Sequence, residues 1–135
     1  VKPMREELVA AGFEELMTPT EVDRFLDDGG GTALLVVNSV CGCAAGMARP
    51  GVKLALKHGH RPQHAGTVFA GQDLDATAKA RSYIQGAPPS SPSMALFDGE
   101  RLVHFLPRHA IEGRDAQSVA FELVSAFDQH CAARA

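Results

Sequence analysis

Two segments near the start of the chain have apolar residues at helical spacing. The first segment lies between Pro3, which suits a first helical position, and Gly12, which offers a stop; its apolar stripe is Met4, Leu8 and Ala11. The second segment follows a capping sequence, Thr18-Pro19-Thr20-Glu21, and its stripe is Val22, Phe25 and Leu26. The pattern predicts two N-terminal helices, and the second ends at the three glycines 29–31.

After these glycines the pattern alternates between strands and helices. Residues 33–37 are a continuous apolar run, typical of a fully buried strand, and residues 67–70 favour a second strand. Between these strands, helical spacing from Cys43 to about His58 predicts a helix that Pro50 kinks.

Four further elements follow the second strand. Asp73 is expected to cap a helix whose apolar stripe is Ala76, Ala80, Tyr83 and Ile84. Asp98-Gly99 is a strong hairpin signal between two apolar strands, residues 94–97 and 102–106. Asp115 starts the last helix, whose stripe is Val119, Leu123, Phe127 and Cys131.

The element order from residue 33 onward is therefore β-α-β-α-β-β-α, which predicts an α/β fold. A right-handed crossover makes the first two strands parallel, and the hairpin adds an antiparallel pair. We expect a central mixed sheet of about four strands, with helices on both faces and an N-terminal helical extension. No linker or repeat divides the pattern, so residues 1–135 are predicted to form a single domain.

Composition and charge exclude several classes of function. The 13 basic and 16 acidic residues give a formal net charge of −3, and aromatic residues make up 6% with no Trp, which argues against a nucleic-acid partner. Neither a membrane-spanning apolar run nor a signal sequence is recognisable, so we expect a cytoplasmic protein with no membrane partner. The odd number of cysteines, 3, does not fit a disulfide-stapled secreted scaffold.

Cys41-Gly42-Cys43 follows the predicted buried strand and precedes the predicted helix. A helix N-terminus stabilises thiolates, so this position needs no basic side chain, although Arg49 lies in the same helix. Residues two positions apart in a helix point about 200° apart, so the pair must straddle the turn before the helix, where Gly42 lets the sulfurs converge. A disulfide between them closes a short ring that is readily reduced, which suits thiol-disulfide exchange.

Other interpretations of these residues stay open. The two cysteines can fill space in the core, because unpaired cysteine is among the most buried residue types. They can also bind zinc with histidines, although the predicted helix separates the cysteines from these histidines by about 20 Å. The histidines concerned are His58, His60 and His64. The alternative to an enzyme is a non-catalytic metal-binding or interaction module; a bound metal is not our expectation.

The remaining candidate residues have weaker signals. Cys131 lies on an apolar stripe and is predicted to be a packed core thiol. His104 and His130 are expected to be hydrogen-bonded histidines without a catalytic role. His109 and Glu112 follow the last predicted strand, so they can border the site.

The element order and the cysteine pair at a helix start resemble the thioredoxin fold, with Pro50 and Pro92 in the places of its helix-kinking proline and its cis-proline. The chain is more specifically similar to the bacilliredoxin family, small bacterial thioredoxin-like proteins that carry Cys-x-Cys. The matching stretches are residues 37–46, 48–50, 88–93 and 109–113.

This resemblance implies a thiol-disulfide oxidoreductase that removes bacillithiol, a low-molecular-weight thiol, from mixed disulfides on client proteins, with possible weak disulfide isomerase activity. It implies that Cys41 attacks and Cys43 resolves, that Gly42, Ser91 and Pro92 support them, and that bacillithiol is the thiol co-substrate with no bound cofactor. The Ser91-Pro92 bond is expected to be cis, with the Ser91 backbone ready to pair with an extended client segment. 

Thioredoxin's buried acid on the preceding strand has no counterpart in residues 34–37. Proton transfer therefore uses water, His109 or Glu112, or the reaction needs no such group.

Overall fold

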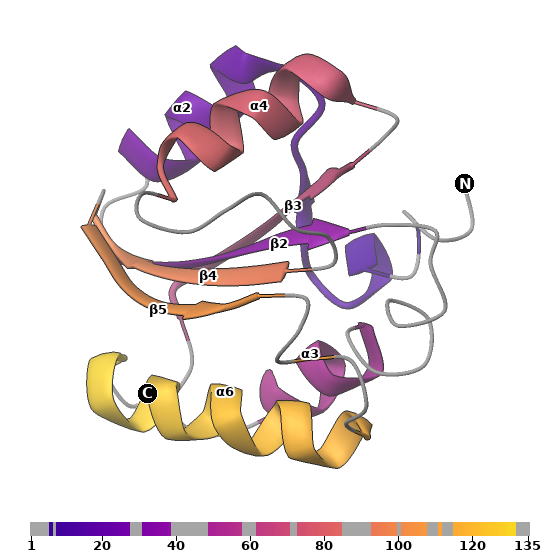
Figure 1. The fold of residues 1–135 in the computed structure, drawn as a ribbon, viewed down its shortest axis with the longest axis vertical. Helices are drawn as coiled ribbons and strands as arrows, with labels where there is room; N and C mark the ends of the chain where they lie inside the picture. The colour runs from indigo at the N-terminus through magenta and orange to yellow at the C-terminus, as the bar shows by residue number, and fades with distance from the viewer. Residues whose placement is uncertain are drawn as a thin grey trace.

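A mixed five-stranded sheet lies between two pairs of helices (Figure 1). The computed structural model describes residues 6, 8–27, 31–38, 49–57, 62–70, 73–84, 93–99, 101–107, 111 and 115–131. The strands are β1 (Glu14–Glu15), β2 (Thr32–Asn38), β3 (His64–Phe69), β4 (Ser93–Asp98) and β5 (Arg101–Leu106), and their order in the sheet is β1-β3-β2-β4-β5. The helices are α2 (Pro19–Asp27), α3 (Arg49–Ala55), α4 (Leu74–Ser82) and α6 (Ala116–His130). The predicted order β-α-β-α-β-β-α from residue 33 is confirmed.

The central strand β2 is buried along its whole length, as its apolar run predicts. It pairs in parallel with β3 and antiparallel with β4. The predicted hairpin between β4 and β5 is also confirmed, and Gly99 in its turn has a φ of 64°, which favours glycine. Because β2 is hydrogen-bonded to a strand on each side, its C-terminal end has a fixed position in the sheet.

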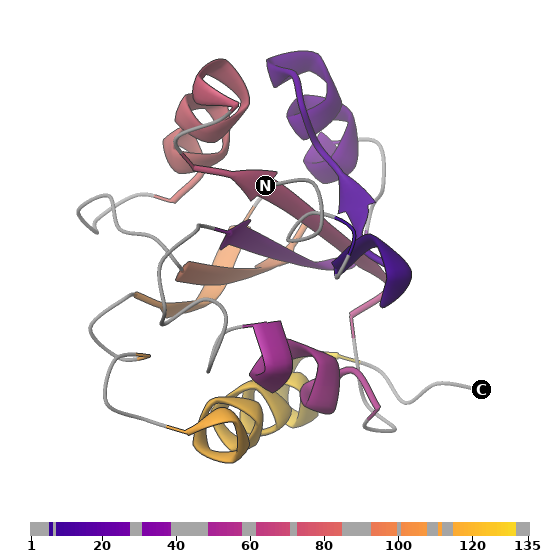
Figure 2. The same ribbon diagram turned by 90° about the vertical axis from the view of Figure 1, so that its right-hand side faces the viewer.

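The two pairs of helices cover opposite faces of the sheet, as the two views show (Figures 1 and 2). On one face α2 and α4 enclose a core that includes Phe25, Leu35 and Phe97. On the other face α3 and α6 enclose a second core that includes Val52, Leu96 and Phe127. Successive side chains of β2 point alternately into the two cores, which explains why no polar alternation marks this strand.

The sheet has one strand more than the sequence predicts. Residues 14–15 form the short strand β1, which pairs in parallel with β3. The N-terminal extension is therefore only partly helical: residues 8–10 are helical, and a turn at Ala11 and Gly12 leads to β1. The pattern missed β1 because two charged residues show no strand periodicity. Their place is set by Phe13 and Leu16, which flank them and are buried.

The predicted helix caps are confirmed at α2 and corrected at α4. At α2 the Thr18 hydroxyl accepts a hydrogen bond from the Glu21 N–H at 3.2 Å, and the Glu21 carboxylate accepts one from the Met17 N–H at 3.0 Å. Asp73 occupies the N-cap position of α4, but its side chain makes no cap hydrogen bond. Its backbone, with φ −105° and ψ 76°, lies outside the extended conformation from which a cap side chain reaches the first turn.

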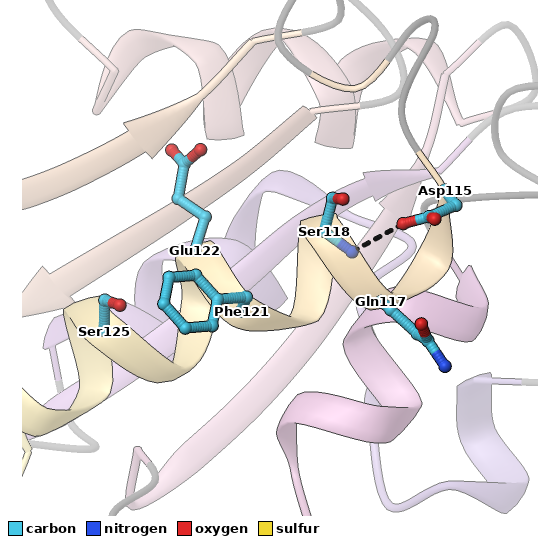
Figure 3. Close-up of a pocket in the computed structure, with 6 residues that line it drawn as sticks. All are labelled: Asp115, Gln117, Ser118, Phe121, Glu122 and Ser125. Atoms are coloured by element: carbon cyan, nitrogen blue, oxygen red, sulfur yellow. Dashed lines mark hydrogen bonds between the residues drawn. The ribbon is translucent and has the colours of Figure 1, made fainter.

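Asp115 caps α6 as predicted, because its carboxylate accepts a hydrogen bond from the Ser118 N–H at 2.8 Å (Figure 3). The same hydrogen bond lowers the pKa of Asp115 below its ordinary value of 3.8. A carboxylate with a lowered folded pKa contributes stability above its unfolded pKa, and this contribution is lost as the pH falls through the folded pKa.

We expect Asp115→Ala to unfold at a lower urea concentration than the unmodified chain at pH 7. The difference should shrink as the pH falls below the ordinary carboxyl pKa and through the lowered pKa of folded Asp115. Asp115→Asn is the matched control, because it keeps a capping acceptor that does not titrate, so the unmodified chain should lose stability relative to this variant in the same pH window. Urea unfolding followed by circular dichroism checks this, and a difference independent of pH would contradict it.

Candidate active site

The candidate cysteines follow the C-terminal end of β2 in the sequence. Cys41, Gly42 and Cys43 are outside the described residues, but Asn38, three positions before Cys41, ends β2 and is 1% exposed. A fully buried strand therefore ends three positions before the first residue of the Cys-Gly-Cys segment, as the sequence predicts.

The candidate residues Ser91 and Pro92 precede β4, which starts at the same edge of the sheet. Ser91 and Pro92 are also outside the described residues, but Ser93 starts β4 directly after them. Val37, near the end of β2, is the antiparallel partner of Ser93. The chain thus leaves β2 toward Cys41 and enters β4 from Pro92 at adjacent points of one sheet edge.

A buried hydrogen bond joins the two described ends of the Cys-Gly-Cys segment. Arg49, the first residue of α3, is 3% exposed, and its Nη1 donates to the side-chain oxygen of Asn38 at 2.9 Å. The Asn38 carbonyl oxygen also accepts a hydrogen bond from the Ala70 N–H at 2.9 Å. The Asn38–Arg49 pair therefore links the end of β2 to the start of α3.

Close packing against α6 holds α3 in place. Gly51 follows Pro50 in the first described turn of α3. Val119 and the Ala116 carbonyl of α6 occupy the space that a side chain on residue 51 would need. Val52 and Ala55 on the same helix are fully buried. The described helix ends at Ala55, before the predicted end near His58, and the predicted kink falls beside residues that the structure does not describe.

The described residues near this edge include no buried carboxylate. The side chains of β2 between its two ends are apolar, and only Thr32 and Asn38 at the ends are polar. The sequence interpretation that the strand carries no acid is confirmed. Sequence reasoning missed the Asn38–Arg49 pair, whose only signals are a polar residue that ends an apolar run and a cation at the start of a helix stripe.

Cys131 is a packed thiol, as predicted. It is 8% exposed at the end of α6, and burial raises the pKa of its thiol; a hydrogen bond with Thr32 lowers this pKa, and the charge of Asp98 raises it. Thr32 starts β2, whereas Asn38 ends it, about 20 Å away at about 3.3 Å per residue. Cys131 is thus at the opposite end of β2 from the end that leads to Cys41.

Two histidines, His64 and His104, have contacts within the fold. His104 Nε2 lies 3.2 Å from Glu122 Oε2, which confirms a hydrogen-bonded strand histidine, and the His64 ring meets the Phe25 ring at a centroid distance of 6.4 Å. His58, His60, His109 and Glu112 are outside the described residues. Among the residues with a described position, no three His, Cys, Asp or Glu side chains form a group able to hold a metal ion.

A surface hollow lies along α6 (Figure 3). Its described lining residues include the exposed Phe121 and Glu122, which contacts His104, and none of these described residues is a cysteine. Across the described part of the chain, each helix is too short or too polar to cross a membrane.

Comparison with known proteins identifies the family. The model of the disulphide isomerase family matches residues 1–131. A curated bacilliredoxin of Halalkalibacterium halodurans is 53% identical over 131 residues, which cover 97% of this chain and 91% of that protein. A bacilliredoxin of Bacillus licheniformis is 54% identical over 132 residues, which cover 97% of this chain and 92% of that protein.

Solved structures with low sequence identity confirm the fold. Fasciola hepatica thioredoxin matches with a TM-score of 0.60 and 14% identity, over 85% of this chain and 99% of that one. Thioredoxin O2 of Arabidopsis thaliana matches with a TM-score of 0.55 and 17% identity, over 89% of this chain and 95% of that one. The predicted thioredoxin-like α/β class is therefore confirmed. From this fold, the family match and these relatives, the chain belongs to the bacilliredoxin family and is a thiol-disulfide oxidoreductase.

Proposed function

We propose that this oxidoreductase removes bacillithiol from mixed disulfides on client proteins and that Cys41 and Cys43 carry the reaction. The observation that carries the proposal is the position of Cys-Gly-Cys, directly after the buried strand β2 of a thioredoxin-like fold in a member of the bacilliredoxin family. Bacillithiol is the co-substrate, and bacillithiolated proteins and the low-molecular-weight thiol are the partners. The reaction needs no bound cofactor.

The proposed reaction has two thiol-disulfide exchange steps. The Cys41 thiolate attacks the bacillithiol sulfur of the mixed disulfide, so that a Cys41–bacillithiol disulfide forms and the client cysteine leaves as a thiolate. The Cys43 thiolate then attacks the Cys41 sulfur, which releases bacillithiol thiolate and leaves a Cys41–Cys43 disulfide. Two equivalents of a small thiol reduce this disulfide and are themselves oxidised to their disulfide.

Ser91 and Pro92 are proposed to support client binding. Ser93, which starts β4, pairs with Val37 near the end of β2. The chain before Ser93 and the chain that leads to Cys-Gly-Cys therefore connect to neighbouring strands at the same edge of the sheet. A backbone there is suited to pair with an extended client segment around its modified cysteine. Gly42 supports the pair by allowing the backbone angles that a two-cysteine turn needs.

A second activity, disulfide isomerisation, is favoured by the description of the matching family model. The same Cys41 thiolate would attack a protein disulfide in place of a mixed disulfide, so that a Cys41–client disulfide forms and one client thiolate leaves. That thiolate would attack another client disulfide, and the thiolate released there would attack the Cys41–client disulfide and free Cys41. Recovery of activity by a client enzyme with scrambled disulfides tests this candidate, because isomerisation needs no net reductant.

The test of the main proposal compares adducts on one client protein. The client is loaded with bacillithiol, glutathione or cysteine as the mixed disulfide, mixed with the reduced chain, and weighed by mass spectrometry over time. We expect the bacillithiol adduct to be removed at least about tenfold faster than the other two, a difference of about 1.4 kcal/mol in the barrier. Equal rates for the three adducts would contradict bacillithiol as the substrate, and no removal of any adduct would contradict the reaction.

A further inference from the structure

Strand β5 lies at the edge of the sheet and, among the described strands, pairs only with β4. Its neighbour β4 is buried from Ser93 to Phe97, whereas residues 102–105 of β5 are half-buried. The backbone N–H and C=O groups on the outer side of an edge strand are a template for a strand of another molecule. β5 therefore presents partly exposed side chains and a strand edge at the same place.

The sequence of β5 favours self-association. Residues 102–106 read Leu-Val-His-Phe-Leu, so His104 is the only polar residue among strong strand formers. Short apolar segments of this kind associate with one another when they lie on a sheet edge. A cation, Arg101, precedes the segment and Pro107, which has no N–H, follows it. Both residue types disfavour the addition of a strand at the two ends of the segment, but they leave its centre open.

The centre of β5 contains one residue more than the facing part of β4. His104 is the partner of Leu96 and Leu102 is the partner of Phe97, so Val103 has no partner on β4. Two residues of one strand then face one residue of the other, which is the arrangement of a β-bulge. A bulge bends its strand and increases the local twist. The edge of β5 is therefore a poor template for a regular partner strand at this point.

The bulge also places two consecutive side chains on one face of the sheet. Leu102 and Phe105 pack against the core under α2 and α4, whereas Val103 packs against the core under α3 and α6. His104 lies on the same face as Val103, because its Nε2 is 3.2 Å from Glu122 Oε2 of α6. Side chains of a regular strand alternate between the two faces, so only the extra residue allows this arrangement. 

The contact between His104 and Glu122 puts a polar pair next to this edge. The side chain of His104 is 31% exposed and that of Glu122 is 29% exposed, so water still reaches both. Figure 3 shows that Glu122 points from α6 toward the strands. A strand added alongside β5 would place its own side chains on this face and would remove water from the pair. Loss of that water costs free energy even when ionisable groups are paired with each other.

We infer that the bulge at Val103 and the His104–Glu122 pair protect β5 from pairing with β5 of a second copy of this chain. The bulge acts by distorting the edge, and the polar pair acts through the cost of removing its water. A second copy is the partner concerned, because antiparallel pairing of one strand with its own copy is symmetric and brings the same apolar segment to both sides. This protection concerns the folded chain and does not depend on the thiol chemistry.

The test removes each of the two features separately. Deletion of Val103 takes away the unpaired residue, and the remaining side chains of β5 then alternate regularly between the two faces. His104→Val removes the polar pair and keeps a residue that favours strands. His64→Val is the matched control, because it makes the same substitution in β3, which lies between β1 and β2 in the sheet. Circular dichroism and urea unfolding establish that each variant is folded.

Sedimentation equilibrium measures self-association of the reduced protein, and hydrogen exchange locates the contact. We expect the Val103 deletion and His104→Val to associate at a protein concentration at least about tenfold lower than the unmodified chain does. The backbone amides of residues 101–106 should exchange more slowly in the associated form, because the new ladder of hydrogen bonds protects them. His64→Val should associate no more readily than the unmodified chain.

Three results would overturn the protective role. A folded variant that associates no more readily than the unmodified chain would refute the role of the feature it lacks. Association without slower exchange in residues 101–106 would place the contact outside β5, and pairing of the unmodified chain through β5 would show that the edge is open. If the Val103 deletion does not fold, the result for His104→Val decides alone.

Discussion

Cys41→Ala should remove no small-thiol adduct from a client protein, whereas Cys43→Ala should remove one adduct per molecule. Attack requires the Cys41 thiolate, so its loss should reduce the rate to that of the uncatalysed exchange. Release requires only a second thiol, which an external small thiol can supply in place of Cys43. Excess small thiol should therefore restore repeated turnover to Cys43→Ala and leave Cys41→Ala inactive.

Mass spectrometry of both client and enzyme measures this difference. Cys43→Ala should gain the mass of one adduct as the client loses it, whereas Cys41→Ala should keep its mass. Cys131→Ala is the matched control, because Cys131 is buried at the end of β2 opposite to Asn38, and its rate of adduct removal should be unchanged. Equal activity of Cys41→Ala and Cys43→Ala would mean that the assigned roles are wrong.

Gly51→Ala should destabilise the protein, although the same change in a free helix stabilises it by up to about 1 kcal/mol. A Cβ atom on Gly51 would lie 2.7 Å from Val119 Cγ1 and 3.1 Å from the Ala116 carbonyl oxygen. These distances are too short for α3 to keep its place on α6, and overpacking of this kind costs about 1–3 kcal/mol. Urea unfolding gives the change in the free energy of unfolding.

A double-mutant cycle with Val119→Ala isolates this contact. Val119→Ala alone removes buried methyl groups and should cost about 1–3 kcal/mol, but it also makes room for a side chain on residue 51. The double variant should therefore be more stable than the sum of the two single changes predicts. Leu54→Ala on the exposed side of α3 is the control and should change stability by less than about 1 kcal/mol. Strict additivity would contradict the steric account.

Most of the element order follows from the local sequence pattern. The apolar run of β2 is long enough to require burial on both faces, and this identified the central strand. The cap at Thr18, the hairpin at Asp98-Gly99 and the cap at Asp115 were also correct, because each depends on hydrogen bonds and backbone angles among neighbouring residues. The local pattern predicted a thiol site at Cys41 and Cys43, and the family resemblance implied which of the two attacks and which resolves.

Features that depend on residues far apart in the chain are visible only in the folded protein. Strand β1 exists because its flanking apolar residues are buried and its backbone pairs with β3, and two glutamates carry no sign of this. The need for glycine at position 51 arises from Val119 of α6, and the buried Arg49 donates a hydrogen bond to Asn38 at the end of β2. Local periodicity predicts where each helix and strand lies along the chain. Where a charge is buried and where two helices pack closely depends on which elements meet, so these contacts exist only in the assembled sheet and helices.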